Sequence, residues 1–225
     1  MDASRIEALV REAMSDSIEP TVFIVDDDPS VRTALGRLFQ SVDLRYELFA
    51  TAEEFLARAR RGLLGCVLLD LRLRGSNGLE VQRQLLTEHP DVTVIVLSAV
   101  VDVSMTVRAM KAGAVEVLTK PFAEQELLDA VNAALETCRV RKREREDLLR
   151  LRTSLDSLTP REREVMSLVV TGMLNKQIAS VLGTAETTVK VHRSQVMHKM
   201  GAESVAALVR MADRLRLDSS ERTSQ

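Results

Sequence analysis

The stretch Cys66-Val67-Leu68-Leu69-Asp70 places four apolar residues before a single carboxylate, and the turn-forming residues 71–78 follow it. A short, wholly apolar run bounded by turn residues predicts a strand buried on both faces, as in a parallel sheet. The same pattern recurs where Thr21–Val25 runs into three aspartates, Asp26–Asp28. Acids at the carboxyl ends of neighbouring parallel strands meet where such sheets bind ligands. Because like charges repel at close range, the pattern predicts a bound cation.

Apolar runs alternate with amphipathic segments from residue 21 to about residue 136. The runs predict strands at Thr21–Val25, Tyr46–Phe49, Cys66–Leu69, Thr93–Leu97 and Glu116–Leu118. The segments predict helices at Pro29–Val42, Ala52–Arg60, Gly78–Glu88, Val103–Ala112 and from Glu124 onward. Asp28 is an expected N-cap before Pro29, and Thr51 with Glu54 forms an expected capping box. Because parallel strands require helical crossovers, the fold class is an α/β doubly wound, five-stranded parallel sheet.

The second part of the chain has a helical pattern only. From Glu124 to about Ser157 no strong breaker interrupts the apolar spacing, so one long helix is expected. It is either a solvated linker or a dimerising coil, whose seam Lys142 and Arg145 interrupt. A capping box at Thr159 and Glu162 then opens a new helix. Three more helices are predicted at Asn175–Val181, Ala185–Met200 and Ser204–Asp213, with breaks at Gly172, Gly183 and Gly201.

The predicted organisation therefore has five parts. They are an extension (1–19), an α/β domain (20–136), a helical linker (137–157), an all-α four-helix domain (158–217) and a disordered tail (218–225). The first domain is acidic, with 12 basic and 17 acidic residues in 20–136, whereas residues 161–217 hold nine basic and five acidic ones. This asymmetry indicates two tasks, the second on nucleic acid.

Composition excludes several other classes of protein. The absence of Trp and an aromatic content of 3% argue against binding by aromatic stacking. Cys66 and Cys138 lack the spacing of metal ligands, so both are expected to be reduced thiols in a cytoplasmic protein. No stretch has the length of a membrane span, and the N-terminus lacks the apolar core of a signal peptide. No membrane association is expected.

Two groups of motifs resemble known families. The acidic pair Asp26-Asp27, then Asp70, Ser98 and Lys120-Pro121, each follow a different predicted strand, and residues 21–136 resemble the receiver domain of two-component response regulators. Residues 156–213 resemble the LuxR-type helix-turn-helix, with its motifs at 175–179 and 187–193. Together they resemble a response regulator of the NarL/FixJ class, on its FixJ-like branch.

The receiver resemblance implies a role for each residue of the acidic edge. Asp70 is the phospho-acceptor, a nucleophile that forms an acyl phosphate. Lys120 pairs with the phosphate, and the Ser98 hydroxyl moves to hydrogen-bond a phosphate oxygen. The resemblance also implies Mg²⁺ between Asp27 and Asp70, with Asp26 acting through water and the Arg72 backbone carbonyl as a further ligand. A cis Lys120–Pro121 bond is expected.

The register of the recognition helix predicts which residues meet DNA. Core positions are expected at Ile178, Ala179, Leu182, Val189, Val196 and Met200. Lys190, Val191, Arg193 and Ser194 then face outward into a major groove. By resemblance, Lys190, Val191 and Ser194 approach bases, with Thr188 on the same helix. Contacts to phosphates are implied for Lys176, His192, Arg193 and Lys199.

The sequence departs from the receiver pattern at two places. Val117 stands three residues before Lys120, where the family usually has an aromatic side chain that rotates inward as the hydroxyl residue moves. Val100-Val101 replaces the His-Gly that FixJ-like receivers tend to carry. The phosphorylation site is thus intact, whereas its coupling to the surface is weaker or takes another route through the fourth helix.

These observations predict a phosphorylation-dependent transcription regulator. A sensor histidine kinase donates a phosphoryl group to Asp70, and the protein binds double-stranded promoter DNA, as a homodimer at least when phosphorylated. It is not expected to be an enzyme. One alternative is a constitutive DNA-binding regulator whose receiver no longer switches. Another is an aspartyl-phosphate phosphatase, but its nucleophile would follow the first strand, and the 116 residues from Thr21 to Glu136 leave no room for a cap domain.

Overall fold

The computed structural model describes residues 20–73, 75, 77–99 and 103–223. Contacts divide the chain into two units, Met1–Lys142 and Arg143–Gln225, and each is described by itself. The predicted extension at 1–19 and the Val100-Val101 pair lie outside the described residues. The boundary between the units falls within one helix, so the limits of the predicted linker stay a prediction.

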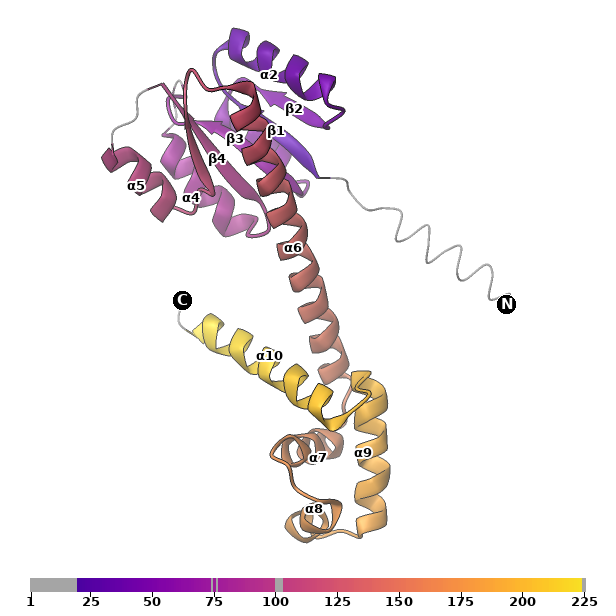
Figure 1. Ribbon diagram of the computed structural model, residues 1–225. Coiled ribbons are helices and arrows are strands. Elements are labelled where there is room, and N and C mark those ends of the chain that lie inside the picture. Colours follow the sequence, from indigo (N-terminus) through magenta and orange to yellow (C-terminus); the bar gives the residue numbers. More distant parts are fainter. Residues whose placement is uncertain (1–19, 74, 76, 100–102, 224–225) are drawn as a thin grey trace. The chain divides into compact units, whose positions relative to one another are not determined.

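The first unit is built on the predicted parallel sheet (Figure 1). Its strands are β1 (Thr21–Val25), β2 (Tyr46–Phe49), β3 (Gly65–Asp70), β4 (Thr93–Ser98) and β5 (Glu116–Thr119), in the order β2-β1-β3-β4-β5. All four pairings are parallel, which confirms the doubly wound fold class. The last three strands each run one residue further than predicted at the carboxyl end. Asp70 and Ser98 are therefore the last residues of their strands.

The crossover helices are α2 (Pro29–Ser41), α3 (Ala52–Ala59), α4 (Gly78–Glu88) and α5 (Val103–Lys111), and α6 (Glu124–Asp156) follows the last strand. The Asp28 side chain caps α2 by accepting a 2.7 Å hydrogen bond from the Ser30 N–H, as predicted. At α3 the Thr51 hydroxyl accepts from the Glu54 N–H at 3.2 Å. The Glu54 carboxylate, however, accepts from the Ala50 N–H at 3.1 Å, so the expected reciprocal capping box at Thr51 is wrong in this half.

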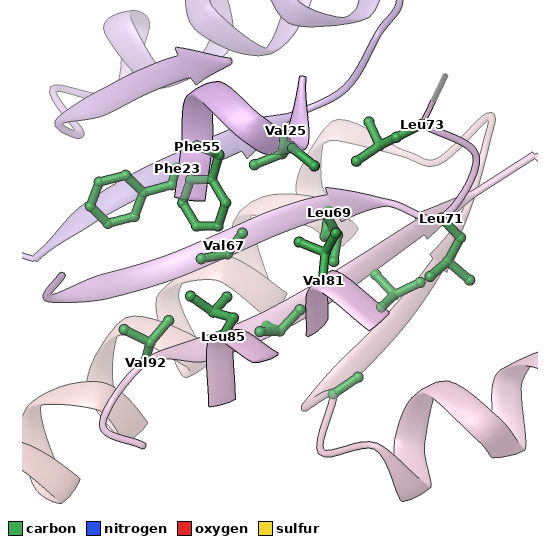
Figure 2. Close-up of a cluster of buried hydrophobic side chains, with 14 of the residues drawn as sticks. Phe23, Val25, Phe55, Val67, Leu69, Leu71, Leu73, Val81, Leu85 and Val92 are labelled. Atoms are coloured by element: carbon green, nitrogen blue, oxygen red, sulfur yellow. The ribbon is translucent and has the colours of Figure 1, made fainter. Parts of the chain in front are cut away.

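The sheet separates two apolar cores. Figure 1 shows α2 and α6 on one face and α4 and α5 on the other. The first core joins β1 and β3 to α2 and α6 through side chains such as Ile24, Leu68, Phe39 and Leu127. The second core is drawn in Figure 2, where Val67 and Leu69 of β3 lie near Val81 and Leu85 of α4. Burial of β3 on both sides explains its unbroken apolar run.

The second unit contains α7 (Pro160–Val170), α8 (Asn175–Leu182), α9 (Glu186–Met200) and α10 (Val205–Thr223), preceded by the end of α6. The capping box of Thr159 and Glu162 is present as predicted. Gly183 and Gly201 end α8 and α9 with φ of 63° and 65°, a left-handed conformation that glycine adopts without strain. The predicted end of α10 at Asp213 is wrong, because the helix runs to Thr223 through residues predicted as tail.

Three further expectations concern the cysteines, the long helix and membrane spans. Cys66 and Cys138 are free and buried, and burial raises the pKa of the Cys66 thiol to about 12, so this thiol is unreactive at neutral pH. The long helix predicted from Glu124 is α6, which has 33 residues. Among the described residues no helix is long and apolar enough to cross a membrane.

Candidate functional site

The carboxylates that follow β1 and β3 form one cluster. Val25 is paired with Leu69 in the sheet, so Asp26 and Asp70 come next on neighbouring strands. Asp26, Asp27 and Asp70 each offer an oxygen atom, and these atoms all lie within 4.8 Å of one another. Asp26 is fully buried and Asp70 is only 8% exposed. The predicted acidic edge is therefore present, and it could hold a metal ion.

Lys120 lies against this cluster from the end of β5. Its Nζ is 2.6 Å from Asp26 Oδ2 and 2.5 Å from Asp70 Oδ2. Burial by itself would lower the pKa of the Lys120 ammonium group, but its hydrogen bonds and ion pairs with the two carboxylates outweigh that effect and raise the pKa. The Lys120–Pro121 peptide bond is cis, as expected. The ammonium group thus offsets the repulsion between the two acids.

Backbone groups hold the other oxygen of each buried acid. Asp70 Oδ1 accepts from the Arg72 N–H at 2.8 Å, and Asp26 Oδ1 accepts from the Asp28 N–H at 2.9 Å. The Arg32 guanidinium donates to the Asp26 carbonyl at 2.7 Å, a contact that was not predicted from the sequence. Both carboxylates therefore have a fixed orientation, with Oδ2 toward Lys120.

Ser98 stands at the end of β4 and is 1% exposed. Its carbonyl accepts from the Lys120 N–H at 2.8 Å, which joins the serine to the lysine segment. Its hydroxyl Oγ lies 3.9 Å from the sulfur of Met105 on α5. The predicted site residues Asp26, Asp27, Asp70, Ser98 and Lys120 are thus gathered at one edge of the sheet.

Gly78 fixes the loop that follows Asp70. A Cβ atom at this position would lie 2.7 Å from the Leu71 Cα and 2.9 Å from the Asp70 carbonyl oxygen, closer than real Cβ atoms come. Any side chain would therefore displace the backbone of the central carboxylate. From the sequence, Gly78 was predicted to end the turn and to begin a helix, and this close approach was not predicted.

The recognition helix α9 presents the predicted face. Val189, Val196 and Met200 are buried, whereas Lys190, Val191 and Ser194 are exposed, with Val191 at 59%. On the same helix Thr188 and His192 are half-buried, and Lys176 of α8 is exposed. The Lys190 ammonium lies 3.1 Å from the Glu186 carboxylate in an exposed ion pair. The predicted core positions of α9 are thus buried, whereas Arg193, which was expected to face outward, is half-buried.

Two basic residues of this surface are held by the protein itself. The half-buried Arg193 donates to Asn175 Oδ1 at 2.9 Å, which joins α9 to the first turn of α8. Lys199 Nζ lies 2.7 Å from Glu162 Oε2 and 3.2 Å from the Ser157 carbonyl oxygen, so the charge of Lys199 is already paired. This pairing fastens the end of α9 to the start of α7. Neither partner was predicted from the sequence.

Glu162 bonds both to Lys199 and to the backbone at the start of α7. Its carboxylate accepts from Lys199 and, at 2.8 Å, from the Thr159 N–H. The hydrogen bond from Lys199, followed by that from the Thr159 backbone, lowers the pKa of Glu162. The capping box and the ion pair therefore share one acid, which connects the entry of the helical unit to its recognition helix.

The fold and the two sites define a class of protein, a receiver joined to a helix-turn-helix. Residues 22–132 match the family model of the response regulator receiver domain. Residues 156–212 match that of the bacterial regulatory proteins of the luxR family. The chain belongs to the response regulators of the NarL/FixJ class, which combine these two domains.

Known relatives align with this chain over most of its length and of theirs. Nodulation protein W of Bradyrhizobium diazoefficiens is 44% identical over 204 residues, which cover 91% of this chain and 90% of that protein. The transcriptional regulatory protein FixJ of Rhizobium meliloti is 39% identical over 192 residues, covering 85% and 94%. The solved structure of the response regulator StyR is 45% identical, covers 87% of this chain and 99% of that chain, and has a TM-score of 0.79.

Membership of this family gives the general function. The protein is a phosphorylation-dependent transcription regulator of a two-component system. Its receiver implies a histidine kinase as partner, and its LuxR-type domain implies binding to DNA. A protein of this kind is a transcription factor. The roles of individual residues do not follow from the family match and are argued next.

Proposed function

We propose that Asp70 is the phospho-acceptor of this regulator and that the acidic edge of the sheet is its phosphoryl-transfer site. The observation that carries the proposal is the position of the Lys120 ammonium group, which lies within hydrogen-bonding distance of both Asp26 and Asp70. Asp70 is the slightly exposed member of this pair and Asp26 is fully buried. An incoming phosphoryl group therefore meets Asp70.

The chemistry is a phosphoryl transfer from a phosphohistidine of the kinase. An oxygen of Asp70 attacks phosphorus, the P–N bond to the histidine breaks, and an acyl phosphate forms. The Arg72 N–H keeps the carboxylate oriented during the attack. Lys120 then pairs with the phosphoryl oxygens as a point charge, and the Ser98 hydroxyl donates a hydrogen bond to one of them.

The residues at this edge fit a magnesium ion. They offer carboxylate oxygens, the hard ligands that Mg²⁺ prefers. Asp27 and Asp70 would bind the ion directly, Asp26 through water, and Arg72 through its backbone carbonyl. The ion would neutralise charge on the transferring phosphoryl group. Asp26 keeps its orientation in this arrangement because the Asp28 N–H holds its Oδ1.

Phosphorylation is proposed to favour a homodimer formed through α5 and β5. An apolar stripe on α5 is exposed at Val103, Val107 and Met110, by 77%, 43% and 45%. Exposed Arg108 and Lys111 lie on the same helix, and exposed Glu116 begins β5. Since a two-fold interface brings each surface against its own copy, these opposite charges can pair across it. The occupant of the stripe is therefore a second copy of the chain.

On DNA we propose that α9 enters the major groove. Its exposed residues Lys190, Val191 and Ser194 approach base edges, with Thr188 on the same helix, and Val191 suits contact with a thymine methyl group. The phosphate contacts proposed from the sequence are Lys176, His192, Arg193 and Lys199. Of these, Lys199 must exchange its bond to Glu162 for one to phosphate. A regulator that binds promoter DNA acts in the bacterial cytoplasm.

The experiment compares Asp70→Asn with Asp28→Asn. The full chain is incubated with acetyl phosphate and Mg²⁺, and intact mass reports the added phosphoryl group. We expect the wild type and Asp28→Asn to be phosphorylated, because Asn also caps helices and Asp28 carries no proposed ligand role. Asp70→Asn should gain nothing. Phosphorylation of Asp70→Asn at the wild-type level would refute the assignment.

The alternative is a constitutive DNA-binding regulator. The observation that favours it is the valine at position 117, where receivers usually have an aromatic residue. Val117 is partly buried against the core below α4 and α5 and has no aromatic ring to move. DNA affinity is therefore measured with Mg²⁺ and beryllofluoride, which mimics an aspartyl phosphate, and without them. Equal affinity in both states, with Asp70 phosphorylated normally, would support the alternative.

A further inference from the structure

The contact between Ser98 and Met105 joins the phosphoryl-transfer site to α5. Ser98 follows Val94 and Val96 at alternate positions of β4, so its side chain points to the core covered by α4 and α5. Met105 lies in the first half of α5 and packs, partly buried, against this same core. The hydroxyl of Ser98 and the thioether of Met105 are 3.9 Å apart.

Few side chains hold α5 in place. Ala109 is the only residue of the described helix that is buried, and the Met105 side chain adds partial burial. One polar bond assists: the Gln82 amide on α4 donates to the Ala109 carbonyl at 2.9 Å. An element with so few buried contacts has a low local stability, so the loss of a single contact can shift its position.

In the described structure, two buried polar atoms, one on α4 and one on α5, make no hydrogen bond. Gln82 Oε1 and Thr106 Oγ1 are buried, and neither has a hydrogen-bond partner. Thr106 lies one turn before Ala109, on the same face of α5. A hydroxyl can donate to an amide oxygen, and buried polar atoms are usually paired. A displacement of α5 along α4 that brought the Thr106 hydroxyl within hydrogen-bonding distance of Gln82 Oε1 would satisfy both atoms and give α5 a second favourable position.

We propose that Met105 is the positioning residue through which Ser98 transmits the phosphorylation of Asp70 to α5. The proposal rests on the proposed function of Asp70. The resting Ser98 hydroxyl faces the Met105 thioether, a weak acceptor. A phosphoryl oxygen on Asp70 is a much stronger, charged acceptor, so the hydroxyl exchanges one for the other. Released from Ser98, α5 moves to the position in which Thr106 bonds to Gln82.

This route needs no large side chain at position 117. Val96 pairs with Val117 in the sheet, and both Val117 and Met105 border the core that Figure 2 shows beside α4. Met105 is unbranched and flexible, so it can change rotamer without displacing Val117. The signal thereby passes from β4 directly to α5, the helix that carries the exposed apolar stripe.

The test compares two opposite changes at position 105. Met105→Leu keeps the apolar volume but removes the sulfur acceptor, whereas Met105→Gln supplies a stronger amide acceptor at similar length. The readout is hydrogen exchange of the α5 amides in the full chain, with Mg²⁺ alone and with beryllofluoride added. Met110→Leu, at an exposed methionine of the same helix, is the matched control.

We expect beryllofluoride to slow exchange in α5 of the wild type and of Met110→Leu by about threefold, because α5 gains the hydrogen bond between Thr106 and Gln82. Met105→Leu should show that slow exchange without beryllofluoride, and Met105→Gln should keep the resting rate in both states. Each variant should keep the wild-type midpoint of thermal unfolding and the wild-type gain in mass with acetyl phosphate. Wild-type exchange in both Met105 variants would overturn the proposal.

A third variant tests whether α5 moves to the displaced position in which Thr106 bonds to Gln82. Thr106→Val removes the hydroxyl with little change in shape, so it should leave resting exchange unchanged and reduce the response to beryllofluoride. A full response in Thr106→Val would refute the pairing with Gln82. The resting comparison of Met105→Leu with the wild type does not require phosphorylation. If Asp70 gains no phosphoryl group, that failure concerns the proposed function and appears in the mass alone.

Discussion

The two charged sites of this protein are built in opposite ways. At the acidic edge of the receiver, the charged side chains come from different strands, are largely buried, and bond to one another through Lys120. On the recognition helix, they come from one element and are exposed, as Lys190 and Glu186 are, at 60% and 45%. One site is assembled by the tertiary fold, whereas the other is displayed on a single helix.

The difference decides how strongly each charge acts. A buried ion pair is poorly screened, and loss of one partner leaves the other charge without compensation. An exposed pair in water contributes about 0–1 kcal/mol and is screened by salt. The receiver edge can therefore respond sharply to one phosphoryl group, while the DNA surface adds many small contributions. The Lys199–Glu162 pair is intermediate, at 28% and 7% exposure.

Lys120→Met should give the largest effect on stability. It leaves the buried Asp26 facing Asp70 without a cation, and breaking a buried pair in this way costs about 3–5 kcal/mol. Urea unfolding with a chelator present measures this loss. Tyr46 and all five phenylalanines lie in the first unit, so near-ultraviolet circular dichroism follows that unit alone.

Two controls sharpen this prediction. Lys111→Met removes an exposed lysine and should change the free energy of unfolding by less than about 0.5 kcal/mol. Added Mg²⁺ should restore much of the stability of Lys120→Met, because a divalent cation compensates the same carboxylates. A Lys120→Met protein as stable as the wild type in the chelator would show that the acidic edge does not depend on its lysine.

Acid should weaken the second unit through Glu162. Its folded-state pKa lies below the ordinary value of 4.5, so the stability that the ionised carboxylate contributes is present above pH 4.5. That contribution is lost as the pH falls from 4.5 through the folded-state pKa. The second unit has no aromatic residue, so helix loss at 222 nm without a change at Tyr46 reports on it.

Glu162→Gln tests the source of this pH dependence. The amide oxygen can still accept from the Thr159 N–H, but the charge that pairs with Lys199 is gone. The unfolding midpoint of the second unit should then vary less between pH 5.5 and about pH 3.5 than in the wild type. Glu164→Gln, at an exposed residue paired with Arg161, is the control. Equal pH dependence in Glu162→Gln and the wild type would contradict the assignment.

The sequence predicted the acidic edge well for a physical reason. A wholly apolar run shows where a buried strand ends, and the fold brings all such ends to one edge. The sequence alone therefore predicts that Asp26, Asp70, Ser98 and Lys120 lie together. The N-caps Asp28 and Thr159 were equally visible, because a cap depends on neighbours within three residues.

Contacts between distant side chains were not visible in the same way. Lys199 meets Glu162 across 37 residues, and the packing of α9 against α7 brings them together. The helical register told which face of α9 is exposed, but not which basic residue already has a partner. The length of α10 was also missed, since no glycine or proline lies between Asp213 and Thr223 to mark an earlier end.

The smallest predicted effect separates orientation from charge on the DNA surface. Asn175→Ala removes the acceptor that holds Arg193, whereas Arg193→Ala removes the guanidinium itself. We expect both variants to weaken binding to the DNA upstream of the protein's own gene by about 1 kcal/mol, the cost of one hydrogen bond. If Arg193 also contacts a phosphate, Arg193→Ala lowers the slope of log affinity against log salt by about one, and Asn175→Ala leaves it unchanged. Equal slopes in both variants and the wild type would mean that Arg193 only orients α9, and that the phosphate charge is met by other basic residues such as Lys176.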